Sequence, residues 1–185
     1  MSEKEKVLMK ILCLLLLNFC FCVTIIAKEK GLVRTKRNSI PNRLIDYRKF
    51  QNIVNSSAEE REVKRLTEED FLKMIQDEEV VLLDARSESR YKLRHIKGAI
   101  SLPFTEFTKE SLSKIIPNMN SKILIYCNNN FTGSPEAFAS KAPAASLNLS
   151  TFISLKAYGY KNIYELGPLL SVDSTKLTFE GTEVQ

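Results

Sequence analysis

The stretch Lys122–Phe131, KILIYCNNNF, decides the fold that the sequence predicts. Residues 123–127 are mostly apolar and favour extended backbone, which predicts a strand buried on both faces. Three asparagines follow, and because asparagine tolerates turn conformations the strand should end there. Cys127 would then lie at the carboxyl end of a buried strand, where open α/β sheets place their binding crevices. A cysteine at this position is either a reactive thiol or a small core residue, and its reactivity distinguishes the two.

The composition limits the kinds of site that the chain can hold. Its 185 residues suffice for one domain preceded by a leader. Cys127 is the only cysteine after residue 22, so the domain itself should contain no disulfide. A single histidine, His95, argues against a zinc site. A magnesium or calcium site made of carboxylates stays open, although no EF-hand spacing appears. We expect no metal and no cofactor.

The positive charge of the chain precedes the predicted domain. Residues 28–65 contain eleven Lys or Arg and five acidic residues, whereas residues 66–185 have a net charge of −2. A nucleic-acid partner needs a basic face on the domain itself, so we do not expect one. The basic segment instead lies against anionic lipid or is simply solvated.

The N-terminal part of the chain has the pattern of a targeting segment. Residues 11–27 are almost all apolar and follow a lysine-containing start, which is typical of a secretory signal peptide or an N-terminal membrane anchor. The sequence therefore predicts an exported protein, periplasmic (extracytoplasmic) or tethered to a membrane through 11–27. A basic linker, 28–64, follows and contains a short amphipathic patch, Leu44–Val54, that packs on the domain or on a neighbour. The domain should span 65–170, and an extended, weakly specified tail should span 171–185.

Strands and helices alternate along the predicted domain. Thr67 is a good N-cap for a helix over Glu68–Gln76, and Gly159 is a good C-terminal stop for a helix over Asn148–Tyr158. Further helices are expected after Ser87 and after Thr105 or Thr108. Strands are expected at 80–83, 99–102, 123–127 and 162–166. This alternation predicts an α/β fold with a parallel sheet and helices on both faces.

Three motifs in this order resemble the rhodanese-like domain across roughly residues 65–170. They are Leu82-Leu-Asp-Ala-Arg86, then Tyr91-x-x-x-His-Ile-x-Gly98 followed by Ala-Ile-x-Leu-Pro103, and Ile123-Leu-Ile-Tyr-Cys127 followed by a helix and Tyr158-Gly-Tyr-x-Asn-Ile-Tyr-Glu-Leu-Gly167. The resemblance implies the rhodanese-like fold, a parallel sheet with helices on both faces. It also implies that Cys127 attacks a sulfane sulfur donor, holds a persulfide and passes the sulfur to an acceptor. Partners would be a small sulfur donor and a thiol acceptor or a protein partner.

The loop after Cys127 departs from the family pattern, which is short and often contains an arginine. Here no positive charge follows Cys127 before Lys141. The side chains of Asn128, Asn129 and Asn130 would bind the anionic sulfur species in its place, or would simply form the turn. The segment 128–147 is either an enlarged loop or a loop with a short helix at Pro135–Ser140. Residues 132–146 would then form a lid over Cys127 or a surface insertion.

Three further residues are expected close to the site. Arg86 would bind substrate through its positive field, or would form an ion pair with Asp84. Asp84 and His95 would be structural. The leading hypothesis is a sulfurtransferase acting through Cys127, and the alternative is a non-catalytic binding or regulatory module of the cell envelope. A phosphatase of the related cysteine-loop type would need an arginine closing the loop, and the sequence has none there.

Overall fold

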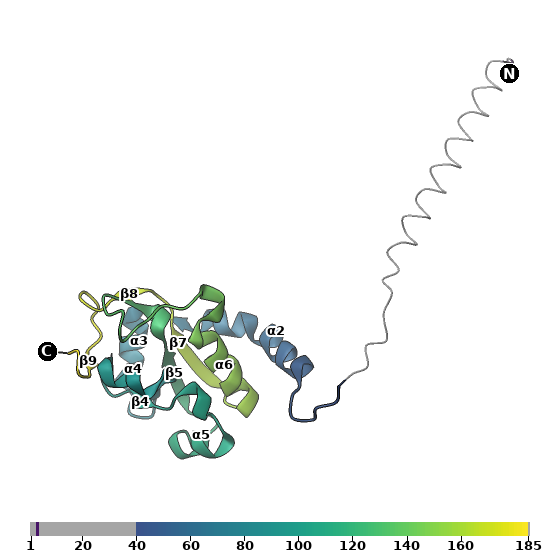
Figure 1. Cartoon of the computed structure of the whole chain (residues 1–185), viewed down its shortest axis with the longest axis horizontal. Helices are drawn as coiled ribbons and strands as arrows, with labels where there is room; N and C mark the ends of the chain where they lie inside the picture. The colour runs from purple at the N-terminus through teal and green to yellow at the C-terminus, as the bar shows by residue number, and fades with distance from the viewer. Residues whose placement is uncertain (1–2, 4–39, 185) are drawn as a thin grey trace. The chain divides into compact units, whose positions relative to one another are not determined.

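The computed structural model describes Glu3 and residues 40–184, and Figure 1 shows how their helices and strands are arranged. A compact unit begins at Leu44, earlier than the boundary at residue 65 that the sequence suggested. Within the described part of the chain, no helix has both the length and the apolar character needed to cross a membrane. The predicted signal or anchor at 11–27 lies outside the described residues, so it stays a prediction.

A five-stranded sheet forms the centre of the unit, with the strand order β1-β7-β5-β2-β4 and all neighbours parallel. The strands are β1 (Arg65–Leu66), β2 (Val81–Asp84), β4 (Ile100–Ser101), β5 (Lys122–Tyr126) and β7 (Asn162–Leu166). The predicted central strand is confirmed, because Ile125 of β5 pairs with Leu83 on one side and with Glu165 on the other. Since the strands are parallel, their carboxyl ends meet at one edge of the sheet.

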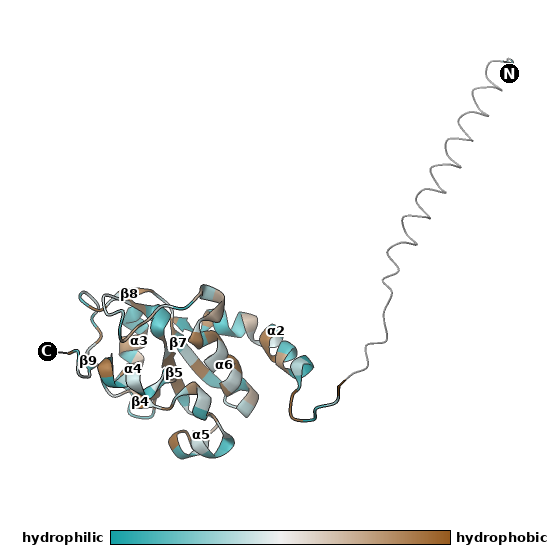
Figure 2. Ribbon diagram, viewed as in Figure 1, coloured by the Kyte–Doolittle hydropathy of each residue, from teal (hydrophilic) through white to brown (hydrophobic). Residues whose placement is uncertain are grey.

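Helices cover both faces of this sheet, as the sequence predicted. They are α2 (Tyr47–Val63), α3 (Glu68–Ile75), α4 (Glu88–Leu93), α5 (Lys109–Ile115) and α6 (Leu147–Tyr158). Side chains of α3 and α4 pack in one core with Leu124 and Tyr126, and side chains of α5 and α6 pack in the other with Ile123 and Ile125. Figure 2 shows hydrophobic residues along the central strands. Because strand side chains alternate, Cys127 belongs to the α6 face.

Local signals explain several element ends. The Thr67 hydroxyl accepts a hydrogen bond from the Asp70 N–H at 3.1 Å and begins α3. Thr108 forms a capping box with Ser111 and begins α5, whereas residues 104–106 form a separate 3₁₀ turn, η1 (Phe104–Glu106). Gly159 ends α6 with φ 100°, a left-handed conformation that glycine adopts without strain. The predicted caps Thr67 and Gly159 are thus confirmed.

Helix α2 extends the short amphipathic patch that the sequence predicted. It begins after Asp46, whose carboxylate accepts the Lys49 N–H at 2.8 Å, and it runs on to Val63. Its C-terminal half packs against α6, where Glu60 pairs with Lys156 at 2.7 Å. The end of α2 nearest the domain therefore packs on it. The apolar side chains of the predicted patch, such as Leu44 and Phe50, are exposed, so what the patch packs on stays a prediction.

The segment after Cys127 is an enlarged loop built of several short pieces. These are η2 (Asn128–Asn130), β6 (Phe131–Thr132) and η3 (Pro143–Ala145). Residues 135–137 form a turn, so the alternative helix at Pro135–Ser140 is wrong. Ala137 and Phe138 are buried, at 0% and 2% exposed, which shows that the middle of this loop belongs to the core.

The tail is more firmly placed than the sequence suggested. Strand β8 (Leu170–Ser171) pairs with β6, and β9 (Phe179–Glu180) pairs with β3 (His95–Ile96). Leu177 is buried, and the ring of Phe179 lies 5.2 Å from that of Phe131. The expectation of a weakly specified tail is therefore wrong, because aromatic contacts fix it to the enlarged loop.

Candidate active site

Cys127 lies where β5 ends, and its thiol has two polar neighbours. The backbone there is extended, with φ −148° and ψ −173°, and the sulfur accepts a hydrogen bond from the Asn130 N–H. The hydroxyl of Ser146 lies 3.4 Å from the sulfur. The whole residue is only 1% exposed. Among the described residues, Asn130 is the one whose main-chain N–H donates to the sulfur.

The first two asparagines after Cys127 bind the returning loop. The Asn128 side chain donates to the Ala139 carbonyl at 2.7 Å. The Asn129 side chain donates to the Lys141 carbonyl at 2.8 Å and accepts the Lys141 N–H at 3.1 Å. These bonds hold residues 139–141 beside the strand end. The geometry favours the turn-forming role for both side chains, and their binding of substrate stays a prediction.

Asn130 connects three parts of the site. Its amide donates to the Leu166 carbonyl at 2.7 Å, at the end of β7. Its side-chain oxygen accepts the Cys127 N–H at 2.9 Å and the Asn148 amide at 3.1 Å. Asn130 is 5% exposed, so these are buried bonds that fix the backbone carrying the thiol. Its predicted contact with an anionic sulfur species is likewise untested.

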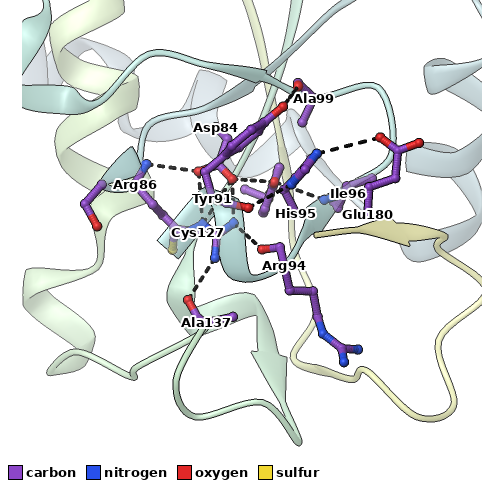
Figure 3. A network of polar contacts seen from close by, with 12 residues as sticks. Asp84, Arg86, Tyr91, Arg94, His95, Ile96, Ala99, Cys127, Ala137 and Glu180 are labelled. Atoms are coloured by element: carbon purple, nitrogen blue, oxygen red, sulfur yellow. Dashed lines mark hydrogen bonds and ion pairs between the residues drawn. The ribbon is translucent and has the colours of Figure 1, made fainter. Parts of the chain in front are cut away.

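Arg86 forms a buried ion pair with Asp84, as Figure 3 shows. Its Nη2 lies 2.5 Å from the Asp84 carboxylate and also donates to the Arg94 carbonyl, while Nη1 donates to the Ala137 carbonyl at 2.9 Å. The guanidinium lies 4.4 Å from the centre of the Phe138 ring. Burial lowers the pKa of Arg86, but its hydrogen bond to Asp84 and the charge of Asp84 raise that pKa above its ordinary value. The geometry therefore favours the ion-pair alternative.

The same carboxylate holds the Tyr126 hydroxyl, which donates to it at 2.5 Å. Burial, with the nearby charge of Asp84, raises the pKa of Tyr126 well above its ordinary value. His95 stacks on Tyr91 at 3.7 Å, its Nδ1 lies 2.8 Å from the Tyr91 carbonyl and its Nε2 lies 3.7 Å from the Glu180 carboxylate (Figure 3). These contacts give Asp84 and His95 the structural environment that the sequence predicted.

Two cavities lie at the carboxyl edge of the sheet. The larger, about 580 Å³, lies beyond β2 and β4 and is lined by Arg86, Asn128 and Lys141 among others. The smaller, about 220 Å³, is the one that Cys127 lines, together with Asn129, Asn130 and Ser146. Arg86 and Cys127 thus border different cavities, although the sequence had placed them at one site.

The cations beside Cys127 come from α2 and β1. Arg61 and Arg65 line the smaller cavity, and both contact Glu165 of β7. Arg61 Nη2 lies 2.5 Å and Arg65 Nε lies 3.1 Å from the same oxygen of Glu165. Glu165 is 2% exposed, and burial raises the pKa of its carboxyl even though the two arginines lower it. None of the three residues was predicted from the sequence. Arg61 lies in the segment treated as a linker, Arg65 is the first residue of the expected domain, and Glu165 lies in a strand without a charge motif.

A family model for the rhodanese-like domain matches residues 67–167. This chain belongs to the rhodanese-like domain family. The resemblance drawn from the three motifs is therefore confirmed, and the rhodanese-like match begins two residues after Arg65. Arg61 and Arg65 thus lie outside the matched part, whereas Cys127, Ser146 and Glu165 lie inside it.

Several solved structures are similar in fold to this rhodanese-like chain. The Alr3790 protein from Anabaena sp. is 18% identical, with a TM-score of 0.44, and the match covers 64% of this chain and 94% of that one. A rhodanese with anions from E. coli is 20% identical, with a TM-score of 0.37 and coverage of 55% and 98%. A complex of an EanB variant with hercynine is 21% identical, with a TM-score of 0.42 and coverage of 56% and 24%. No curated protein matches the chain.

Proposed function

We propose that the protein is a sulfurtransferase that carries sulfane sulfur as a persulfide on Cys127. The observation that carries this proposal is the position of the thiol in a rhodanese-like domain, at the end of the central strand and beside a cavity lined by two arginines. A cysteine thiolate is a strong nucleophile, and catalysis through a covalent intermediate needs one with access to its substrate.

The surroundings of Cys127 suit a small anionic donor. With thiosulfate, the thiolate would attack the outer sulfur, a new sulfur–sulfur bond would form and the old one would break. Sulfite would leave with the electron pair of the broken bond. Arg61 and Arg65 would stabilise the negative charge of the departing group, the role that charged donors play in other active sites. Cys127 is 1% exposed, so a donor would approach through the cavity of about 220 Å³.

The test is a measurement of mass after incubation with thiosulfate. We expect the intact protein to gain the mass of one sulfur atom, and dithiothreitol to remove it. Cys127→Ser should gain no sulfur in peptides after residue 22, because they contain no other cysteine. A wild-type protein that gains no mass with thiosulfate or with an organic persulfide would contradict the proposal.

A non-catalytic binding module is the second candidate. Its support is that Arg86 and the three asparagines are engaged in internal hydrogen bonds, and that the larger cavity of about 580 Å³ lies away from Cys127. In that case residues 132–146 would recognise a partner protein. The two candidates differ in their response to Cys127→Ser, which would abolish sulfur transfer but leave binding through the loop intact.

We further propose that the protein acts outside the cytoplasm or at a membrane, tethered through residues 11–27. Support comes from that apolar run and from five exposed apolar side chains that lead into and begin α2: Ile40, Leu44, Ile45, Tyr47 and Phe50. Figure 2 shows hydrophobic residues in the same stretch. Cell fractionation of the full chain, with and without deletion of residues 11–27, tests this location. If the full chain and the deletion variant were found in the cytoplasm in equal amounts, that result would contradict the proposed location.

A further inference from the structure

Three buried polar atoms without a hydrogen-bond partner belong to residues that line the cavity of Cys127. They are Glu165 Oε2, Asn148 Oδ1 and Arg61 Nε. The described residues contain five buried, unpaired side-chain atoms of this kind, so three of the five belong to residues of this cavity. Glu165 and Asn148 are only 2% and 5% exposed. Buried polar groups are nearly always paired in folded proteins, so a cluster of unpaired ones beside a thiol indicates a site for a polar ligand.

Glu165 is placed to act on a group that binds at Cys127. It pairs with Ile125 on the neighbouring strand, two residues before the cysteine. Ile123, Ile125 and Ile163 pack in the core on the α6 side, so both Glu165 and Cys127 project to that side. Arg61 and Arg65 hold one carboxylate oxygen, while the other is the unpaired Oε2.

We propose that Glu165 is a catalytic residue that takes the proton of a thiol acceptor as the acceptor removes sulfur from Cys127. This inference rests on the proposed sulfurtransferase function and names its acceptor class, a small molecule that carries a protonated thiol. The cavity of about 220 Å³ admits only a small group beside the sulfur.

The step balances without another reactant. The acceptor sulfur forms a bond to the outer sulfur of the persulfide, and the bond between that sulfur and Cys127 Sγ breaks. The bonding electrons go to Sγ, which leaves as a thiolate, so the acceptor sulfur is oxidised and Sγ is reduced. The thiol proton goes to Glu165 Oε2. The products are a persulfide on the acceptor, a free Cys127 thiolate and a protonated Glu165.

The environment of Glu165 makes its carboxylate a stronger base than an ordinary glutamate, because the pKa of the carboxyl is raised. Burial raises the pKa of its carboxyl, and a general base is most effective when its pKa approaches the working pH. The charged groups that act on it are Arg61 and Glu62 of α2 and Arg65 of β1. Asn148, on α6, and Cys127, after β5, also line the cavity, and neither bears a permanent charge.

The experiment loads each protein with sulfur and then measures how fast two different acceptors remove it. Full-length wild type, Glu165→Gln and Glu59→Gln are charged with thiosulfate, and the persulfide is then discharged by dithiothreitol or by sulfite. Sulfite needs no base, because it has no thiol proton to lose. We expect Glu165→Gln to slow transfer to the thiol about 100-fold more than transfer to sulfite, the size of a general-base contribution. Glu59→Gln, at an exposed position of the same helix that does not line the cavity, should leave both rates unchanged.

Each outcome decides the inference. An equal loss with both acceptors would mean that Glu165 only positions the arginines, and no loss with the thiol would mean that it takes no proton. Failure of the wild type to charge would overturn the proposed function and this inference together. If Glu165→Gln does not fold, the wild type serves instead: thiol transfer should slow in heavy water and sulfite transfer should not, and equal effects would overturn the proposal.

Discussion

Replacing Asn130 by alanine should destabilise the domain strongly. The side chain satisfies the Cys127 N–H and the Leu166 carbonyl, and it also accepts from the Asn148 amide. Asn130 is only 5% exposed, so water does not readily replace these bonds. Each buried polar group left unpaired costs about 1–3 kcal/mol, and two backbone groups lose their partner, so we expect a loss of about 2–6 kcal/mol. A domain of this kind has a total stability of about 5–15 kcal/mol, so the loss is large.

Urea unfolding followed by circular dichroism measures this change, and Asn129→Ala is the matched control. Asn129 is the preceding residue of the same type, but its bonds join it to Lys141 at the surface. We expect its loss to stay under about 1 kcal/mol. Equal losses for the two variants would refute the reasoning, because they would show that burial of the Asn130 bonds contributes nothing. Asn130→Ala should also speed the reaction of Cys127 with Ellman's reagent in the native protein, since the strand end loses its anchor.

Three further predictions concern other parts of the fold. Arg86→Met should cost about 3–5 kcal/mol, because it leaves the fully buried Asp84 carboxylate without its counter-charge, and adding Asp84→Asn should recover part of the loss in urea unfolding. Burial raises the pKa of Glu165, so the native state binds this proton more tightly than the unfolded state does. The free energy of unfolding should therefore fall as the pH rises from the ordinary pKa of 4.5 toward the raised pKa. Glu165→Gln should remove that fall. Phe179→Ala should lower the free energy of unfolding by about 2–4 kcal/mol, because its ring contacts Phe131 and Phe138. Urea unfolding measures this loss, and the thermal midpoint should fall with it.

These predictions have distinct controls. An Arg86→Met protein as stable as the wild type would mean that the Asp84 charge finds another partner. A Glu165→Gln variant that keeps the wild-type pH dependence would show that another group titrates. Val184→Ala, at a position 36% exposed near the end of the same tail, should change the midpoint little, whereas a loss equal to that of Phe179→Ala would contradict the role given to the aromatic contacts.

Most of the sheet could be predicted from the sequence because its signals are local. The apolar run before Cys127, the cap at Thr67 and the stop at Gly159 each depend on a few adjacent residues, and the structure places them as expected. The enlarged loop was harder to predict. Ala137 and Phe138 are buried because Arg86, far away in the sequence, binds the Ala137 carbonyl and stacks on the Phe138 ring. No local pattern encodes that contact.

The candidate site was predicted only in part for the same reason. Cys127 could be found from its place after a strand. Arg61 and Arg65 could not, because their approach to Glu165 depends on how α2 packs against α6 and on the pairing of β1 with β7. A charged residue in a segment without a motif has no signal that distinguishes a surface side chain from one that enters a site. Asn130 could be selected as one of the three asparagines that follow Cys127. Its hydrogen bonds to Leu166 and Asn148 could not be predicted, because they depend on tertiary contacts.

The origin of the two arginines has a consequence for how such proteins diversify. The family match starts at residue 67, so the two arginines that line the cavity of the thiol come from helix α2 and strand β1, which precede the matched part. Exchange of that helix would alter the chemistry at Cys127 while leaving every residue of the shared architecture in place. A comparison limited to the loop after Cys127 would then miss a change in the charge beside the thiol.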